Sequence, residues 1–149
     1  MKEYNKLSLT FHVRPKAIQS VRFRRIGNFV STYQPKANIE WKAWIKKQAI
    51  DQLPKGFKVF QEAVEITKLH FIFAPLKSFS KKKLIALENG EILYKTTKPD
   101  LIDNLCKGFI DALSGVVYRD DALIARTNNI AKFYGLSPAI ELDIMIIKE

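Results

Sequence analysis

The sequence predicts a single small α+β domain, residues 1–149, in which two main helices pack on a mixed β-sheet. Its 149 residues, 47% of them hydrophobic, are enough for one domain with its own core. Segments in which every second residue is apolar alternate along the chain with segments whose apolar residues recur at the helical period. Because no internal repeat, low-complexity tract or linker divides the chain, we expect the helices and strands to share one core.

The strands are predicted from their alternation. Residues 7–13 (LSLTFHV) alternate strictly between apolar and polar side chains, the pattern of a half-buried strand, and Pro15 ends it. In residues 140–147 the apolar residues at every second position share one face of a last strand. The remaining strands are expected at residues 64–73, at 116–118 and within 122–134.

The helices are predicted from their spacing and end signals. The first main helix is expected between Asn38, a favourable helix cap, and a stop at Pro54. A short lysine-rich helix is expected within residues 76–92, and the second main helix over about 99–114, with Gly115 at its C-terminal end. The apolar positions of the first helix are Trp41, Ile45, Ala49 and Leu53.

The net charge and the apolar segments of the chain indicate which kinds of binding partner to expect. The formal net charge is +10 and the isoelectric point is near 9.7, a balance that favours a polyanionic partner, most often nucleic acid. No stretch approaches the roughly 20 apolar residues of a membrane span, and the N-terminus lacks the apolar core of a signal peptide. We therefore expect a cytoplasmic protein with no membrane partner. One cysteine and two histidines exclude an internal disulfide and a closed zinc site of the usual kind, so any metal would be bound by oxygen atoms.

Residues 16–33 form a basic segment without an acidic residue. Gly27 and Asn28 favour a turn, so the segment is predicted to be a basic hairpin or a mobile basic arm. Basic residues interleaved with aromatic ones suit the binding of nucleic-acid phosphates and bases, although a merely solvated loop would have the same composition. The basic residues are Lys16, Arg22, Arg24 and Arg25, and the aromatic residues are Phe23, Phe29 and Tyr33.

Carboxylates gather in the second main helix. Since each helical residue advances about 100°, Asp103, Lys107 and Asp111 lie on one polar stripe. Such a stripe can be no more than a solvent-exposed ion pair, and Asp111 can support helix packing or pair with Lys107. Asp100 can belong to a capping box that begins at Thr97. The buried face is expected to consist of Ile102, Leu105, Cys106, Phe109 and Leu113.

A second acidic pair, Asp120 and Asp121, follows the helix. A strand that runs back from Gly115 would bring one of the two carboxylates near Asp103. Convergent carboxylates repel one another unless a cation lies between them. Mg²⁺ accepts such ligands, and Mn²⁺ accepts the same ones. A site of this kind can activate a water molecule for attack on a phosphodiester, with Lys107 on the phosphate.

The two segments KPDLIDNLCK (98–107) and DALSGVVYRDDALI (111–124) resemble the signature of the RusA family of Holliday junction resolvases. Residues 13–40 resemble the family more loosely. The resemblance implies a homodimeric, Mg²⁺-dependent endonuclease that binds four-way DNA junctions and cuts two strands symmetrically, in recombination and repair, without a small-molecule cofactor. Family members are often encoded by phages and prophages, so a bacterial or phage-infected cell is implied.

Carried over residue by residue, the resemblance implies metal ligands at Asp100, Asp103 and Asp121, with Asp120 less favoured, and Lys107 as the essential lysine. This sequence has one residue more between its first two aspartates than the family pattern, namely Ile102 in DLID. The extra residue can bulge before the helix, or the helix can run back through Asp100. In a third outcome Asp100 is only a cap, and the protein is a catalytically weakened junction-binding or architectural DNA protein.

The expected DNA surface extends beyond the hairpin. Arg126 and Lys132 share a face if their strand is unbroken, and Phe23 or Phe29 would be the residue that wedges into a junction centre. A basic RNA-binding protein with a coincidental acidic pair is a further alternative. The complete set of predicted DNA contacts is Lys16, Arg22, Arg24, Arg25, Lys98, Arg126 and Lys132.

Overall fold

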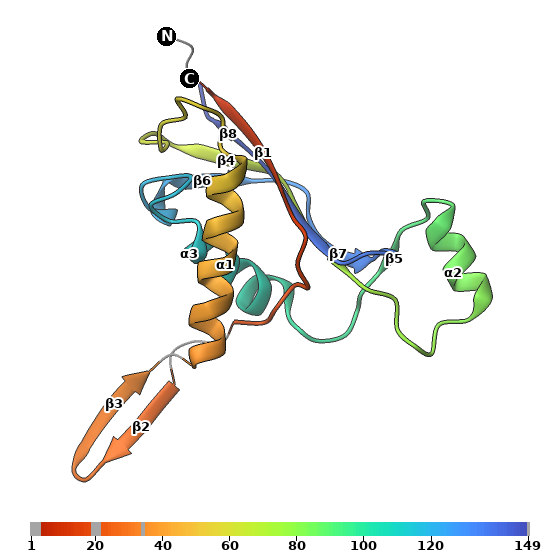
Figure 1. Ribbon diagram of the computed structural model, residues 1–149, viewed down its shortest axis with the longest axis horizontal. Coiled ribbons are helices and arrows are strands. Elements are labelled where there is room, and N and C mark those ends of the chain that lie inside the picture. Colours follow the sequence, from red (N-terminus) through yellow and green to blue (C-terminus); the bar gives the residue numbers. More distant parts are fainter. Residues whose placement is uncertain (1–3, 19–21, 34, 149) are drawn as a thin grey trace.

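The computed structural model describes residues 4–18, 22–33 and 35–148, and it has the predicted α+β architecture (Figure 1). A six-stranded mixed sheet has the order β1-β8-β4-β7-β5, and β6 also pairs with β4. β1 and β4 run antiparallel to β8, whereas β6 and β7 run parallel to β4. The strands are β1 (Lys6–Phe11), β4 (Val64–Phe73), β5 (Leu93–Tyr94), β6 (Ile124–Thr127), β7 (Ile130–Tyr134) and β8 (Ala139–Ile146).

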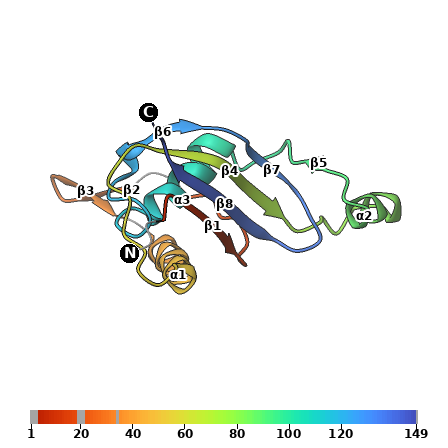
Figure 2. The ribbon, with the colours of Figure 1, turned by 90° about the horizontal axis from the view of Figure 1, so that it is seen from above.

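Two helices cover this sheet, and a third lies apart. α1 (Lys36–Gln52) and α3 (Lys107–Ala112) contact each other, and both contribute to the core formed with the sheet. A π-helix (Leu101–Cys106) leads directly into α3, so the two form one continuous helical segment. α2 (Lys81–Glu88) is set apart from the body of the domain, beyond β5 (Figure 2). The two helices that face the sheet are therefore the ones that the sequence predicts.

The core is centred on aromatic side chains that join the helix to the sheet. Phe109 of α3 is fully buried, and its ring meets those of Phe11 at 5.1 Å and Phe71 at 5.9 Å between centroids, edge to face in both cases. Ile45 and Ala49 on the inner face of α1 are also fully buried, as their helical spacing predicts. The long central strand β4 buries apolar residues against three neighbouring strands, and its bounds agree with the prediction.

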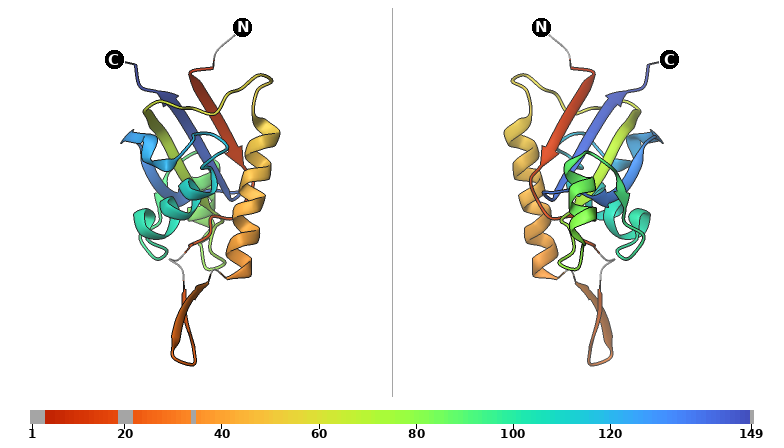
Figure 3. Two further views of the ribbon diagram at one scale, coloured as in Figure 1. Left: turned by 90° about the vertical axis from the view of Figure 1, so that its left-hand side faces the viewer. Right: turned by 90° about the vertical axis from the view of Figure 1, so that its right-hand side faces the viewer.

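The basic segment forms a separate hairpin, which confirms one of its two predicted forms. β2 (Arg22–Ile26) and β3 (Phe29–Tyr33) pair only with each other, around a turn at Gly27 and Asn28. The hairpin projects from the body of the domain (Figure 3). Gly27 has a positive φ of 58°, a conformation that glycine adopts without the strain of a side chain.

Three local predictions are wrong. α1 begins at Lys36 after Pro35, whose restricted φ suits a helix start, and Asn38 is buried inside the first turn instead of capping it. Residues 116–118 are not a strand, because the hydroxyl of Tyr118 donates to the carbonyl of Ile110 and folds the chain back on the helix.

The third concerns residues 122–134, where the predicted strand is interrupted. Asn129 takes a φ of 54°, which asparagine tolerates better than most residues, and the chain divides there into β6 and β7. Arg126 and Lys132 therefore do not lie on one unbroken strand. Both strands still pair with β4, one after the other along its length.

Candidate active site

The helix that carries Asp103 and Lys107 begins with a π-turn, and this turn accommodates the extra residue of DLID. The amide of Leu105 donates to the carbonyl of Asp100 at 3.1 Å, a bond that spans five residues in place of the usual four. Ile102 points outward and is 62% exposed, so its predicted place on the buried face is wrong. Downstream of the wide turn, Leu105, Cys106 and Phe109 are buried as predicted.

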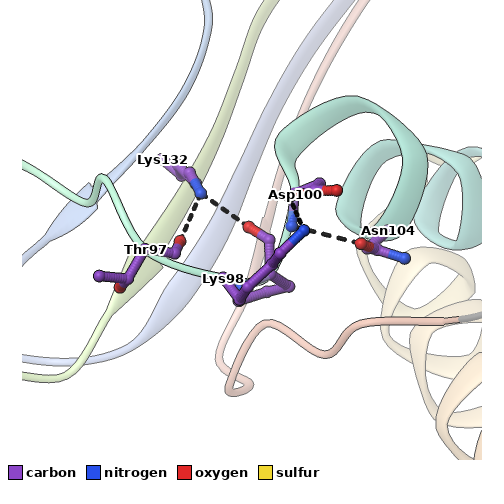
Figure 4. A network of polar contacts seen from close by, with 6 residues as sticks. Thr97, Lys98, Asp100, Asn104 and Lys132 are labelled. Atoms are coloured by element: carbon purple, nitrogen blue, oxygen red, sulfur yellow. Dashed lines mark hydrogen bonds and ion pairs between the residues drawn. The ribbon is translucent and has the colours of Figure 1, made fainter.

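Asp100 is the residue before the π-turn, with an extended backbone, and its carboxylate does not cap the helix. The carboxylate accepts a hydrogen bond from Lys98 Nζ at 2.8 Å, and this bond, with the charges of Lys98 and Lys132, lowers the pKa of Asp100. The Asp100 amide instead donates to the side-chain oxygen of Asn104 at 3.3 Å (Figure 4). The predicted capping box at Thr97 is wrong, because the helix begins after Asp100.

Lys132 forms two hydrogen bonds to the loop that leads into this helix. From the neighbouring strand β7, its ammonium group donates to the carbonyls of Thr97 at 2.6 Å and Pro99 at 2.7 Å (Figure 4). Hydrogen bonds from a charged donor are stronger than those between neutral groups. Lys132 thus fixes the backbone on both sides of Lys98 and next to Asp100. A contact between Lys132 and DNA stays a prediction.

Asp103 and Lys107 lie one turn apart on the exposed surface of the helical segment. Asp111 pairs with Lys42 of α1 at 2.7 Å, so its predicted role in helix packing is confirmed and its alternative pairing with Lys107 is not found. Within the described part of the chain, Lys107 has no carboxylate at ion-pair distance. The phosphate contact of Lys107 stays a prediction.

Asp120 and Asp121 lie in a tight turn, and not in the predicted strand. Asp120 precedes a 3₁₀-helix (Asp121–Leu123), and its carboxylate accepts from the amide of Ala122 at 2.8 Å, which is the main reason that the pKa of Asp120 is lowered. Hydrogen bonding with the neighbouring Asp120 carboxyl group, some desolvation and the charges of Asp120 and Asp111 together raise the pKa of Asp121.

The donor chemistry of these residues fits Mg²⁺, which takes carboxylate oxygens and keeps several waters. Two adjacent carboxylates also repel each other, and a bound cation relieves that repulsion. In the described ranges, however, no group of three histidine, cysteine, aspartate or glutamate side chains is close enough to hold a metal ion. A shared site of Asp100, Asp103 and Asp121 therefore stays a prediction.

Replacing Asp120 by Asn is expected to lower the pKa of Asp121 toward its ordinary value. The change replaces the Asp120 carboxyl group by a neutral amide, and so removes the carboxyl–carboxyl hydrogen bonding and one negative charge, the first and third causes of the upward shift. Because the folded-state pKa of Asp121 is raised, the stability from its protonated form is present at low pH and is lost as the pH rises through that pKa. Carboxyl NMR titration of the metal-free protein measures the shift, and an unchanged Asp121 pKa in the variant would contradict it.

Sequence reasoning missed the residues that join the basic hairpin to this helix. Ile18, just before the hairpin, is 4% exposed, and its amide donates to the carbonyl of Asn104 at 3.0 Å. Ile18 also packs closely against Gly108. A β-carbon at position 108 would lie 2.4 Å from Ile18 Cβ, so only glycine fits there without a shift. A glycine next to the predicted lysine in a helical pattern is the signal that could have revealed the close approach.

Replacing Gly108 by Ala is expected to lower the free energy of unfolding by about 1–3 kcal/mol, the usual cost of overpacking. Because the added methyl group would collide with Ile18 Cβ, the double variant Gly108→Ala, Ile18→Gly, which removes that atom, should lose less stability than the sum of the two single variants. Urea denaturation of the four proteins measures this coupling. Strictly additive losses would show that the two residues do not contact each other.

The other predicted DNA contacts lie on several elements. Lys98 and Arg25 are exposed, Lys16 is half-buried, and Arg22 and Arg24 belong to β2. Arg126 is bound by Glu65 of the neighbouring strand, with 2.5 Å between Nε and Oε1. In the described residues, no helix is long and apolar enough to cross a membrane.

Comparison with known proteins bears on these observations. The family model described as endodeoxyribonuclease RusA matches residues 12–145, nearly the whole chain. The chain belongs to the RusA family. It is also 43% identical over 67 residues to an uncharacterized protein of Bacillus subtilis (strain 168), YqaN, a match that covers 45% of each chain. The match therefore spans less than half the length of this curated relative.

Deleting Ile102, the residue that exceeds the RusA pattern, is expected to leave the domain folded. The side chain is largely exposed, and its removal would turn the bond between Leu105 and Asp100 into an ordinary α-helical one. The free energy of unfolding should change by less than about 1 kcal/mol, as for other surface changes. Circular dichroism melting measures it, and deletion of the buried Leu105 is the matched control. Equal unfolding of both deletion variants would contradict the prediction.

Proposed function

We propose that this RusA-family protein is a Mg²⁺-dependent endonuclease that resolves four-way DNA junctions by paired symmetric nicks. The observation that carries the proposal is the exposed Asp103 and Lys107 stripe, in a chain that matches the endodeoxyribonuclease family over residues 12–145. The high positive charge supports a polyanionic substrate. Four-way or other branched DNA is the proposed partner, in the cytoplasm of a bacterial or phage-infected cell.

The proposed metal ligands are Asp100, Asp103 and Asp121. When bound, Mg²⁺ or Mn²⁺ would supply an activated water and neutralise charge on the phosphodiester. Lys107 contributes a positive charge to a phosphate oxygen of the substrate. Asp120, which the amide of Ala122 holds in place, adds a second negative charge beside Asp121. Lys132 orients Asp100 through the loop carbonyls on either side of Lys98.

The active form is proposed to be a homodimer. Symmetric cuts in two strands need two active sites related by a two-fold axis, which one copy of the chain cannot supply. Sedimentation analysis of the protein with and without junction DNA should therefore give a dimer in the complex. A complex with one copy per junction would contradict symmetric cutting.

A second candidate function is an architectural junction-binding protein that cuts weakly or not at all. The observation in its favour is the engagement of Asp100 by Lys98, at 2.8 Å, in a chain whose first two aspartates are one residue further apart than in the family pattern. A cation at Asp100 would have to compete with this exposed lysine. The two functions differ only in whether strand scission follows binding.

Cleavage of a labelled synthetic four-way junction tests the proposal. The junction is incubated with the protein and Mg²⁺ beside a linear duplex of the same sequence, an RNA hairpin and an EDTA control. Paired nicks at symmetric positions in the junction alone are expected. Tight junction binding without nicks in Mg²⁺ and in Mn²⁺ would favour the architectural function, and preference for the RNA hairpin at fixed salt would contradict both.

A further inference from the structure

The tip of the β2–β3 hairpin carries three exposed apolar side chains. Phe29 is 77% exposed, Val30 69% and Ile26 52%. Ile26 is paired with Phe29 and Arg25 with Val30 across the ladder, and cross-strand partners lie on the same face. The apolar tip, defined as Ile26, Phe29 and Val30, therefore presents apolar surface on both faces of the ribbon.

The hairpin has no support from the main sheet in the described structure. It forms its own two-stranded sheet and extends away from the rest of the domain (Figure 3). An isolated two-stranded hairpin is marginally stable in water. Exposed apolar groups gathered at the end of such an element indicate a surface that contacts a partner.

The charge of the segment identifies the kind of partner. No aspartate or glutamate occurs from residue 4 to residue 39, whereas this stretch contains seven lysines and arginines. Arg25 is exposed and donates through Nε to the carbonyl of Gly27 at 3.0 Å, which keeps its guanidinium group beside the turn. A partner that is polyanionic and also offers apolar faces is a nucleic acid with unstacked bases.

The chain just before the hairpin contacts the helical segment of the candidate active site. Ile18 precedes β2 by only a few residues, and it is seated on Gly108 and hydrogen-bonded to Asn104, both in the helical segment that carries Asp103 and Lys107. The described chain segment that precedes the hairpin thus contacts the helical segment that carries the candidate site. Other exposed apolar residues, such as Leu76, Ile85 and Ile92, lie on α2 or in the loops beside it, and α2 is set apart from the body of the domain (Figure 2).

We propose that the apolar tip is the branch-recognition element of the protein. Ile26, Phe29 and Val30 contact bases at the branch point, where stacking is already interrupted, while Arg25 holds a flanking phosphate. Apolar side chains that enter a base step must overcome stacking energy, and this cost is lowest where the duplex is already disrupted. The tip therefore selects junctions over linear duplex. This inference rests on the proposed function, since it names the recognition element for the same substrate.

The test compares the wild type with the variant Ile26→Ser, Phe29→Ser, Val30→Ser, which keeps every charge. The matched control, Leu76→Ser, Ile85→Ser, Ile92→Ser, removes similar exposed apolar side chains far from the hairpin. Affinities for a four-way junction and a linear duplex are measured in EDTA, with 2-aminopurine at the branch point and at a matched duplex position. The tip variant should lose about ten-fold or more of its preference for the junction, in line with the loss of a base contact, and should lose the fluorescence increase at the branch point. The control should retain both.

Several results would overturn the inference. The first is a tip variant that keeps the junction preference and the fluorescence increase. The second is a tip variant that changes the molecular mass of the protein, or its binding to anionic lipid vesicles, while the junction preference is unchanged. A change in molecular mass would assign the tip to contact with a second copy of the chain, and a change in vesicle binding would assign it to a membrane surface.

The outcome also separates this inference from the proposed function. If both proteins nick junctions in Mg²⁺ and prefer them equally, the tip is not the recognition element and the resolvase function stands. If neither protein nicks junctions but only the wild type perturbs the branch point, the tip is the recognition element and the endonuclease proposal fails.

Discussion

Replacing Asp121 by Asn should abolish junction cleavage while leaving folding and junction binding unchanged. The side chain is exposed on a tight turn, so its loss opens no cavity. Even a change in the shell around a metal ligand costs about 10–100-fold in affinity or activity, and loss of a ligand should cost at least as much. Asp103→Asn is expected to behave in the same way, because Asp103 is also exposed.

The measurement is the initial rate of nicking of a labelled junction, with binding followed separately in EDTA. Asp51→Asn is the matched control, since Asp51 is an exposed aspartate near the far end of α1 and belongs to neither acidic segment. The control should cleave at the wild-type rate. If Asp121→Asn and Asp103→Asn both lose folding and binding together, these aspartates are structural and the proposed site is wrong.

Replacing Phe109 by Ala is expected to lower the free energy of unfolding by about 3–5 kcal/mol, the range for removing a buried aromatic ring. Phe109 is fully buried and packs edge to face on Phe11 and Phe71, so its ring joins α3 to β1 and β4. Since the whole stability of a domain is about 5–15 kcal/mol, the variant should be close to unfolding.

Urea denaturation followed by circular dichroism measures this loss. Phe79→Ala is the matched control, because Phe79 packs on Tyr134 near α2 with 4.8 Å between centroids but is only partly buried. The control should lose much less stability than Phe109→Ala. Equal losses would mean that the extension near α2 contributes as much to stability as the main core does.

The strands were predictable where one residue pattern dominates. β4 is a ten-residue run rich in β-branched and aromatic residues, and its predicted bounds are correct. β1 and β8 pair with each other along most of their length, as their alternating apolar residues favour. The break at Asn129 was not predicted, because strand-forming residues occur on both sides of it; the chain divides at the positive φ of Asn129, although both halves pair with β4.

The helical segment shows why the candidate site was harder to predict than the fold. Assigning faces at 100° per residue put Ile102 in the core, but a π-turn shifts every residue before it relative to those after it. Leu105, Cys106 and Phe109 anchor the downstream part in the core, so the change falls on the exposed upstream part. Burial also raises the pKa of the Cys106 thiol to about 11, which agrees with its predicted role as a buried apolar residue.

The polar contacts around the site depend on residues that are distant in sequence. Lys132 and the loop at Thr97 are far apart in the chain, as are Lys42 and Asp111, and no local pattern predicts that these groups meet. Sequence identified the carboxylates through their family pattern. Only the fold reveals that Lys42 pairs with the carboxylate of Asp111 and that Lys132 binds the loop carbonyls next to Asp100.

The most direct test of the central claim is cleavage of a supercoiled plasmid that extrudes a cruciform. A junction resolvase that cuts two strands as a pair converts this plasmid to a linear product. The wild type in Mg²⁺ should yield linear product from the cruciform plasmid alone. The wild type in EDTA and the Asp121→Asn variant in Mg²⁺ should yield no linear product. A plasmid that is bound but stays supercoiled in both Mg²⁺ and Mn²⁺, or equal cutting by Asp121→Asn, would contradict the account.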